Sequence, residues 1–337
     1  MRASPFDLFD HGAYRRWRDA KLSRAPHAWQ ELVVDVADPL RLSQTERQGL
    51  LQRCSDTNMA IYRSARTESD KGIVLAVARQ LGLSRLDGNW LADEDGITPI
   101  AVDRSRADRQ AFIPYTDRPI QWHTDGYYQP PSRPVRAMLL HCVRSAAHGG
   151  CNTLMDHEMA YVALRDANPD WVRALMAPDA MTIPAREDGD GVARAQQCGP
   201  VFSIDACDGS LHMRYTARTR SIVWKDDAAT RLAVAFLREL LQTDAANVLR
   251  VRLEPGMGLV CNNVLHARSA FADHPAHPRL LYRARYLDRI APPATDVFAP
   301  ARSTAAAAGP GAVGAAPADP FSAVRARSPT APGPQPA

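Results

Sequence analysis

The sequence predicts a mainly β protein with flanking helices, whose core is an antiparallel sandwich or jelly roll. From about residue 86 onward the β-prone runs are short, irregularly spaced and separated by Gly, Asp and Pro. Strand–helix–strand alternation is rare in this part, which argues against a doubly wound parallel sheet. Apolar residues make up 45% of the 337 positions, which is enough for a sizeable buried core.

The N-terminal part predicts a helical flank. Residues 1–30 show no clear periodicity and are expected to pack at an edge, and ELVVDV (31–36) is short and β-prone. Ser43 and Glu46 form the S-x-x-E pattern that starts a helix, and NMAIYRSA (58–65) reads as a strand. The run 68–82 has apolar residues on one face and ends in a glycine, which predicts a second helix.

The rest of the chain up to Ile290 supplies the predicted strands. They are TPIAV, PIQWH, VRAMLLHCV, MTIPA, PVFSID, SLHMRYT, VLRVRL, GLVCN and RLLYRARYL, interrupted by helical runs at 155–176 and 225–243. In residues 291–337 Ala, Pro and Gly occupy 16, 10 and 4 positions, so this segment cannot bury enough apolar surface to order itself. We therefore expect one domain over 1–290 and a disordered tail over 291–337.

Charge and cysteine usage exclude several classes of protein. The net charge is only +4 and basic residues are spread along the chain, so neither a nucleic-acid partner nor a membrane surface is indicated. The N-terminus has no apolar leader, which makes the cytoplasm the expected location. Six scattered cysteines without a C-x-x-C pair are expected to stay reduced. Enzymes of this size are commonly symmetric, so a homo-oligomer is left open.

The stretch PIQWHTDGYY (119–128) contains the first two candidate metal ligands. His123 and Asp125 end an apolar run, and residues two apart on a strand project from the same face, so both side chains can converge on one ion. His266 follows another strand-like run 143 positions later. Two imidazoles and one carboxylate leave the opposite positions of an ion open, an arrangement that suits non-heme Fe(II) working on dioxygen.

Four motifs occur together in order, WHTDG, GG-x-x-T, N-x-L-H-x-R and a following Arg, between about Ala111 and Arg289. In this the chain resembles the Fe(II)/2-oxoglutarate-dependent dioxygenases of the taurine dioxygenase-like (TauD/TfdA) family, in the branch with γ-butyrobetaine hydroxylase and clavaminate synthase. The resemblance implies a double-stranded β-helix core and an iron site of His123, Asp125 and His266. It further implies that Thr153 and Arg279 bind 2-oxoglutarate and that Arg283 reaches an anionic group of the primary substrate.

The implied reaction is a hydroxylation of a small anionic or zwitterionic metabolite, which uses O2 and 2-oxoglutarate and releases succinate and CO2. Because Asp125 is a carboxylate and not a small residue, we disfavour a halogenase. Two other readings stay open: a zinc-dependent hydrolase on the same two-His-one-Asp site, and a non-catalytic sensor that binds 2-oxoglutarate. Dependence on oxygen and 2-oxoglutarate separates the oxygenase from the hydrolase, and a sensor would bind 2-oxoglutarate without turning it over.

Of three other polar sites, two are expected to be structural and the third is left open. In DHE, Asp156 is read as a helix N-cap, with His157 and Glu158 on a solvated first turn. His141 lies within a strand and is read as a hydrogen-bonded sheet residue. An Asn at 262 or 263 either orients a ligand or closes a turn.

The class of substrate stays open at this point. Arg214, Arg218 and Arg220 add positive charge that suits an anionic group. A set of aromatic residues could equally form a cage for a quaternary amine: Tyr127, Tyr128, Tyr215 and Trp224.

Overall fold

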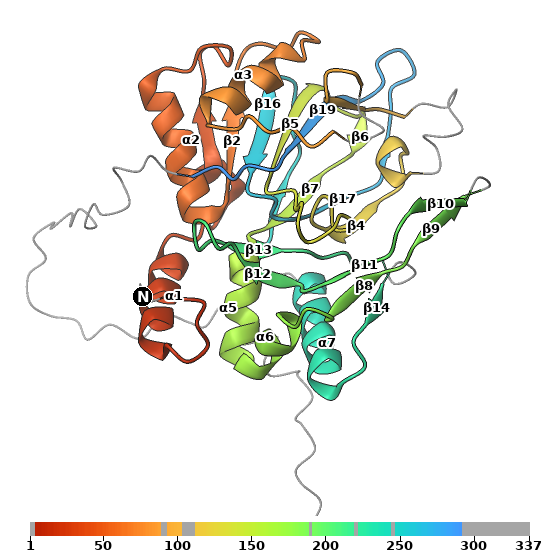
Figure 1. The fold of residues 1–337 in the computed structure, drawn as a ribbon. Helices are drawn as coiled ribbons and strands as arrows, with labels where there is room; N and C mark the ends of the chain where they lie inside the picture. The colour runs from red at the N-terminus through yellow and green to blue at the C-terminus, as the bar shows by residue number, and fades with distance from the viewer. Residues whose placement is uncertain are drawn as a thin grey trace, which may run out of the picture.

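The computed structural model describes residues 4–88, 93–102, 112–188, 191–218, 222–243 and 247–291. Two facing sheets lie at the centre, with helices on the outside (Figure 1). One group of helices covers the larger sheet, and a second group lies beyond the small hairpins at the other end of the molecule. The expected tail, apart from Ala291, lies outside the described residues. No helix among the residues the structure describes is long and apolar enough to cross a bilayer.

The larger sheet has six strands in the order β1-β2-β16-β5-β19-β3. Their bounds are Val33–Asp35, Met59–Arg63, Met257–Cys261, Ala137–Arg144, Leu280–Tyr286 and Thr98–Ile100. All pairs are antiparallel except β1 with β2. Because β5 is apolar along almost its whole length, it can be buried on both faces, and it lies in the middle of the sheet.

Helices α2 (Gln44–Thr57) and α3 (Gly72–Gln80) pack on the outer face of this sheet. The predicted capping box is confirmed, since Ser43 Oγ accepts from Glu46 N–H at 3.3 Å and Glu46 accepts from Ser43 N–H at 2.6 Å. Gly82, just beyond α3, has φ +85°, a conformation in which a side chain would be strained.

The smaller sheet has four strands in the order β15-β7-β17-β4. Their bounds are Leu249–Val251, Asn152–Met155, Leu265–Arg268 and Ile120–His123. Leu154 and Leu249 from this sheet join Ile61, Leu140 and Leu259 from the larger sheet in one buried cluster. The space between the two sheets is therefore a packed core.

The second group of helices packs with some of the short strands around an aromatic core that includes Tyr161 and Phe202. The helices are α1 (His11–Ser23), α5 (His157–Ala167), α6 (Pro169–Leu175) and α7 (Ala228–Gln242). The short strands are β6 (His148–Gly149), β8 (Met181–Ile183), β9 (Arg186–Asp188), β10 (Gly191–Arg194), β11 (Gln197–Gly199), β12 (Phe202–Ile204), β13 (Leu211–Met213), β14 (Val223–Trp224) and β18 (Phe271–Ala272).

Two expectations about helices need correction. The run 155–176 is two helices and not one, because Asn168 before Pro169 is extended and caps the second helix by accepting from Asp170 N–H. The first 30 residues do more than lie at an edge. Helix α1 packs into the aromatic core, where Tyr14 donates a hydrogen bond to Asp166 at 2.6 Å.

Candidate metal centre

The three predicted metal ligands lie together. His123 at the end of β4 and His266 on β17 are directly paired across the two antiparallel strands, and their ring centroids are 4.1 Å apart. Asp125 follows two residues after His123, and one ligand atom from each of the three side chains lies within 4.8 Å of the others. All three residues are buried. Strand pairing thus brings His266 to His123 from 143 positions away in the sequence.

The two imidazoles are oriented in the same way by their own strands. His123 Nδ1 lies 2.9 Å from Gln121 O, and His266 Nδ1 lies 2.9 Å from Val264 O. Since a carbonyl oxygen can only accept, each Nδ1 carries the proton and each Nε2 keeps its lone pair. Both rings are therefore held in the tautomer that binds a metal through Nε2.

The charge state of the cluster also suits a cation. Burial lowers the pKa of His123 to about 3 and that of His266 below its usual range, so both rings are neutral at pH 7. Burial alone would raise the pKa of Asp125, but Arg283 and Arg285 hold it below its usual range. Asp125 Oδ2 is buried without a hydrogen-bond partner. A carboxylate with an unused oxygen beside two unprotonated Nε2 atoms fits a divalent ion.

Asn263 fixes the backbone at Asp125. Its amide accepts from Asp125 N–H at 2.7 Å and donates to Asp125 O at 2.9 Å and to Val135 O at 2.6 Å. The residue has φ +52°, which Asn tolerates better than most residues. Two roles were left open for the asparagines, closing a turn and orienting a ligand. Asn263 fulfils both, and the ligand that it orients is the proposed ligand Asp125. Asn262 instead bonds Asn58 and the backbone of Ile290.

Arg279 lies just before β19 with its guanidinium buried and 4% of the residue exposed. It lines a small pocket with Asn152, Arg252 and the glycines at 149 and 150. Nη1 of Arg279 has no hydrogen-bond partner, and no carboxylate within the described ranges lies at ion-pair distance. Burial lowers the pKa of this guanidinium. A buried, unpaired cation is costly, and a carboxylate of a ligand would offset that cost.

The structure does not bring Thr153 to this pocket. Strand β7 pairs residue by residue with β17, so that Thr153 lies opposite Ala267 and Asn152 opposite Arg268. Side chains alternate between faces along a strand, so Thr153 lies on the face opposite to that of His266, whereas Asn152 shares the face of His266. Asn152 is buried and its Nδ2 has no hydrogen-bond partner. The pocket beside Arg279 is therefore lined by the Asn152 amide and not by the Thr153 hydroxyl.

Arg283 lies beside the metal ligands. Its Nη1 is 3.2 Å from Asp125 Oδ1. Two residues on, Arg285 is paired with the buried Asp87 at 2.5 Å and donates to the Tyr128 hydroxyl at 2.9 Å. One face of β19 therefore directs two guanidinium groups toward the segment that follows His123.

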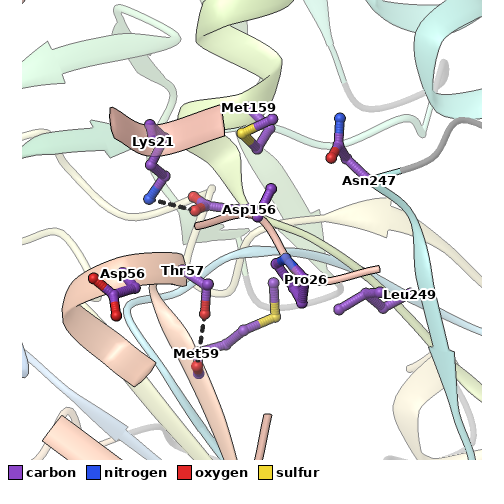
Figure 2. Close-up of a pocket in the computed structure, with 10 residues that line it drawn as sticks. Lys21, Pro26, Asp56, Thr57, Met59, Asp156, Met159, Asn247 and Leu249 are labelled. Carbon is purple, nitrogen blue, oxygen red and sulfur yellow. Dashed lines mark hydrogen bonds and ion pairs between the residues drawn. The ribbon is translucent and has the colours of Figure 1, made fainter. Parts of the chain in front are cut away.

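The helix start at 156–158 differs from expectation. Asp156 is the N-cap and accepts from Glu158 N–H at 2.9 Å, but His157 and Glu158 are buried and not solvated. Lys21 of α1 lies 2.6 Å from Asp156 Oδ2 and 2.5 Å from Glu158 Oε2. Figure 2 shows the Lys21 side chain reaching Asp156 in a pocket that contains no proposed metal ligand. The cluster joins α1 to α5 and is structural.

The remaining polar positions are largely accounted for by local bonds. His141 is a hydrogen-bonded sheet residue as expected, with Nδ1 2.9 Å from the Tyr62 hydroxyl. Arg214 is buried and donates to four backbone carbonyls, those of Tyr127, Met181, Gln197 and Pro200. Arg218 is exposed, and Arg220 lies outside the described residues.

Comparison with known proteins gives three kinds of match. Residues 20–285 match the family described as "Taurine catabolism dioxygenase TauD, TfdA family". A uridine-5′-phosphate dioxygenase from Amycolatopsis sp is 34% identical over 173 residues, which span 50% of this chain and 60% of that relative. A uridine-5′-phosphate dioxygenase from Streptomyces sp is 30% identical over 204 residues, 57% of this chain and 70% of that relative.

Solved structures share the fold. An asparagine oxygenase in complex with Fe(II), 2S,3S-3-hydroxyasparagine and succinate superposes with a TM-score of 0.54 over 80% of this chain and 91% of that one, at 15% identity. The likeness confirms the predicted class, a double-stranded β-helix core with flanking helices.

Proposed function

Because the chain belongs to the TauD/TfdA family of dioxygenases, we propose that it is an Fe(II)- and 2-oxoglutarate-dependent dioxygenase that hydroxylates a small anionic metabolite. The overall reaction inserts one oxygen atom of O2 into a substrate C–H bond. The other oxygen atom enters succinate as 2-oxoglutarate loses CO2. The observation that carries the proposal is the buried group of His123, Asp125 and His266 with two unprotonated Nε2 atoms and one unpaired carboxylate oxygen.

His123, Asp125 and His266 would hold Fe(II), which when bound supplies the activation of dioxygen. The protein's own contribution is to hold these ligands still. The carbonyls of Gln121 and Val264 hold the two rings, and Asn263 holds the backbone of Asp125. Fixed ligand geometry of this kind is what a reactive metal site requires.

Arg279 and Asn152 would bind the distal carboxylate of 2-oxoglutarate. A guanidinium offers two parallel donors to a carboxylate, and the Asn152 amide adds a third donor from strand β7 of the other sheet. Asn152 lies opposite Arg268, two residues along β17 from His266. The strand rise places these positions roughly 7 Å apart, a distance that suits a five-carbon co-substrate.

For the primary substrate we favour an anion over a quaternary amine. Tyr128, one of the aromatic residues considered for a cationic cage, already has the guanidinium groups of Arg194 and Arg285 at 5.8 and 6.0 Å from its ring. A third cation there would be repelled. The two curated relatives act on uridine 5′-phosphate by name, so a nucleoside 5′-phosphate is the first substrate to test. Arg283 would contact its anionic part.

We propose the cytoplasm as the location, and the free cysteines in the described part of the chain are compatible with a reducing compartment. The zinc hydrolase and the sensor are less well supported. A zinc hydrolase would not explain why the buried guanidinium of Arg279 lacks an acidic partner. A sensor would not explain why three potential metal ligands are held in one orientation.

The test measures succinate from 2-oxoglutarate with Fe(II), ascorbate and air, in the presence and absence of uridine 5′-phosphate and other small anions. We expect substrate-stimulated succinate from the wild type and background from His123→Ala. His141→Ala is the matched control, since it removes a buried imidazole that has no metal role. No succinate above the His123→Ala background with any compound, together with bound zinc, would favour the hydrolase.

A further inference from the structure

Asp87 is a buried carboxylate that the proposed reaction does not use. It is 1% exposed, and its backbone N–H donates to Arg285 O at 2.8 Å. Its Oδ2 accepts from Arg285 Nη2 at 2.5 Å and from Gln129 Nε2 at 2.8 Å. Arg133 Nη2 lies 3.4 Å from Oδ1, but the side chain of Arg133 is half exposed, so water screens its charge. The main charged partner of Asp87 is therefore Arg285, which is 4% exposed.

Arg285 is the second of two guanidinium groups on the face of β19 that lies toward Asp125. Residues two apart on a strand share a face, so Arg285 lies beside Arg283, whose Nη1 is 3.2 Å from Asp125 Oδ1. Burial would raise the pKa of Asp125, but the positive charges of Arg283 and Arg285 lower it. The charge of Arg285 therefore acts on the proposed metal ligand. Within the described ranges, Asp87 is the one carboxylate at ion-pair distance from Arg285.

The charges around Asp125 do not balance without Asp87. Asp125 alone would supply one negative charge to two guanidinium groups and a divalent cation. Its Oδ2 has no hydrogen-bond partner, so this oxygen is open to a metal ion and equally open to a guanidinium. A buried guanidinium that loses its anion is costly and takes another acceptor where one is near. For Arg285 that acceptor is Asp125, because the negative charges of Tyr128, Asp125 and Asp87 together raise the pKa of Arg285 although burial would lower it.

We propose that Asp87 is a positioning residue for the metal site, which holds Arg285 away from Asp125 and leaves the free carboxylate oxygen to the cation. This inference rests on the proposed function, because it assigns Asp87 a role toward the proposed metal. The two members of the ion pair then have opposite effects. Removing the charge of Asp87 releases Arg285 and weakens metal binding, whereas removing the charge of Arg285 removes a competitor for Asp125. A purely structural ion pair predicts the same loss from either change.

The test is anaerobic titration of the full chain with Fe(II), without 2-oxoglutarate, so that no added anion changes the balance of charge. Asp87→Asn should lose roughly ten- to a hundredfold of the affinity for Fe(II), the usual effect of changing a group that supports a metal ligand. Arg285→Gln and the double variant Asp87→Asn/Arg285→Gln should bind Fe(II) at least as tightly as the wild type. Glu158→Gln is the matched control, since it also removes the charge of a buried carboxylate paired with a buried cation, Lys21, and it should leave the affinity unchanged.

Equal affinity for Fe(II) in Asp87→Asn and the wild type would overturn the inference and leave the proposed metal site standing. A loss in Arg285→Gln as large as the loss in Asp87→Asn would show a structural role, and would overturn it too. If circular dichroism shows that Asp87→Asn does not fold, the double variant decides, because it leaves neither charge unpaired. Weaker binding than the wild type in that variant contradicts the inference, and equal binding supports it. A wild type that does not bind Fe(II) would remove the proposed function, and the inference with it.

Discussion

Replacing Asn263 tests how the proposed metal site is built. The Asn263 amide makes three hydrogen bonds in a buried setting, two of them to the backbone of Asp125. At about 1 kcal/mol net for each bond, removing the side chain should lower the free energy of unfolding by about 3 kcal/mol. Asn263→Ala should cost about 1 kcal/mol more than Asn263→Gly, because only alanine is strained at φ +52°.

Urea unfolding of the wild type and the two variants measures the loss in free energy of unfolding and the difference between the Ala and Gly variants. The difference between Ala and Gly isolates the backbone, since both variants lack the same amide. Anaerobic titration of the Gly variant with Fe(II) then measures how the substitution changes the affinity of the proposed site for the metal. We expect a roughly ten- to hundredfold loss of metal affinity, the usual effect of removing a group that orients a ligand. An Asn263→Gly variant within 1 kcal/mol of the wild type, with unchanged affinity for Fe(II), would refute the reasoning.

Three further predictions follow from the same structure. Gly149→Ala should destabilise by more than about 3 kcal/mol, because its Cβ would lie 2.2 Å from Ala270 O, whereas Gly209→Ala, at a similar positive φ but in open space, should cost only about 1 kcal/mol by thermal unfolding. Arg279→Lys should raise the KM for 2-oxoglutarate roughly tenfold or more, since lysine keeps the charge but loses the paired donors; an unchanged KM would remove Arg279 from the pocket's function. Burial alone would raise the pKa of Glu158, but Lys21 holds it below its ordinary value of 4.5, so the stability from this carboxylate is present above pH 4.5 and lost as the pH falls below it. Urea unfolding between pH 7 and 3 should show this loss in the wild type and a flatter profile in Glu158→Gln.

The family, the fold class and the grouping of His123, Asp125 and His266 could all be predicted from the sequence. The reason is that the two halves of the metal site are local patterns: two residues apart on a strand for the first pair, and a motif on a second strand for the last ligand. The two halves meet because β4 and β17 are neighbours in one sheet, with His123 directly opposite His266.

Which residue of β7 lines the pocket beside Arg279 could not be predicted in the same way. A shift by one residue along a strand moves a side chain to the opposite face. Thr153 and Asn152 are neighbours in the sequence, but their side chains project from opposite faces of β7. Only the register of β7 on β17 separates them. Similarly, Glu158 reads as a solvated first-turn residue until helix α1, more than 130 positions earlier, brings Lys21 to it.

The order of strands in the larger sheet has a consequence for how the protein is made. Strand β2 is complete when residue 63 has been synthesised, but its neighbour β16 begins at residue 257. At 5–20 residues per second, translation of the intervening stretch takes roughly 10–40 s, during which one edge of β2 has no strand to pair with. His266 emerges still later. A cation held by His123, Asp125 and His266 would therefore bind only late in synthesis, and α2 and α3, which pack on the outer face of the larger sheet, would be available to cover β2 long before that.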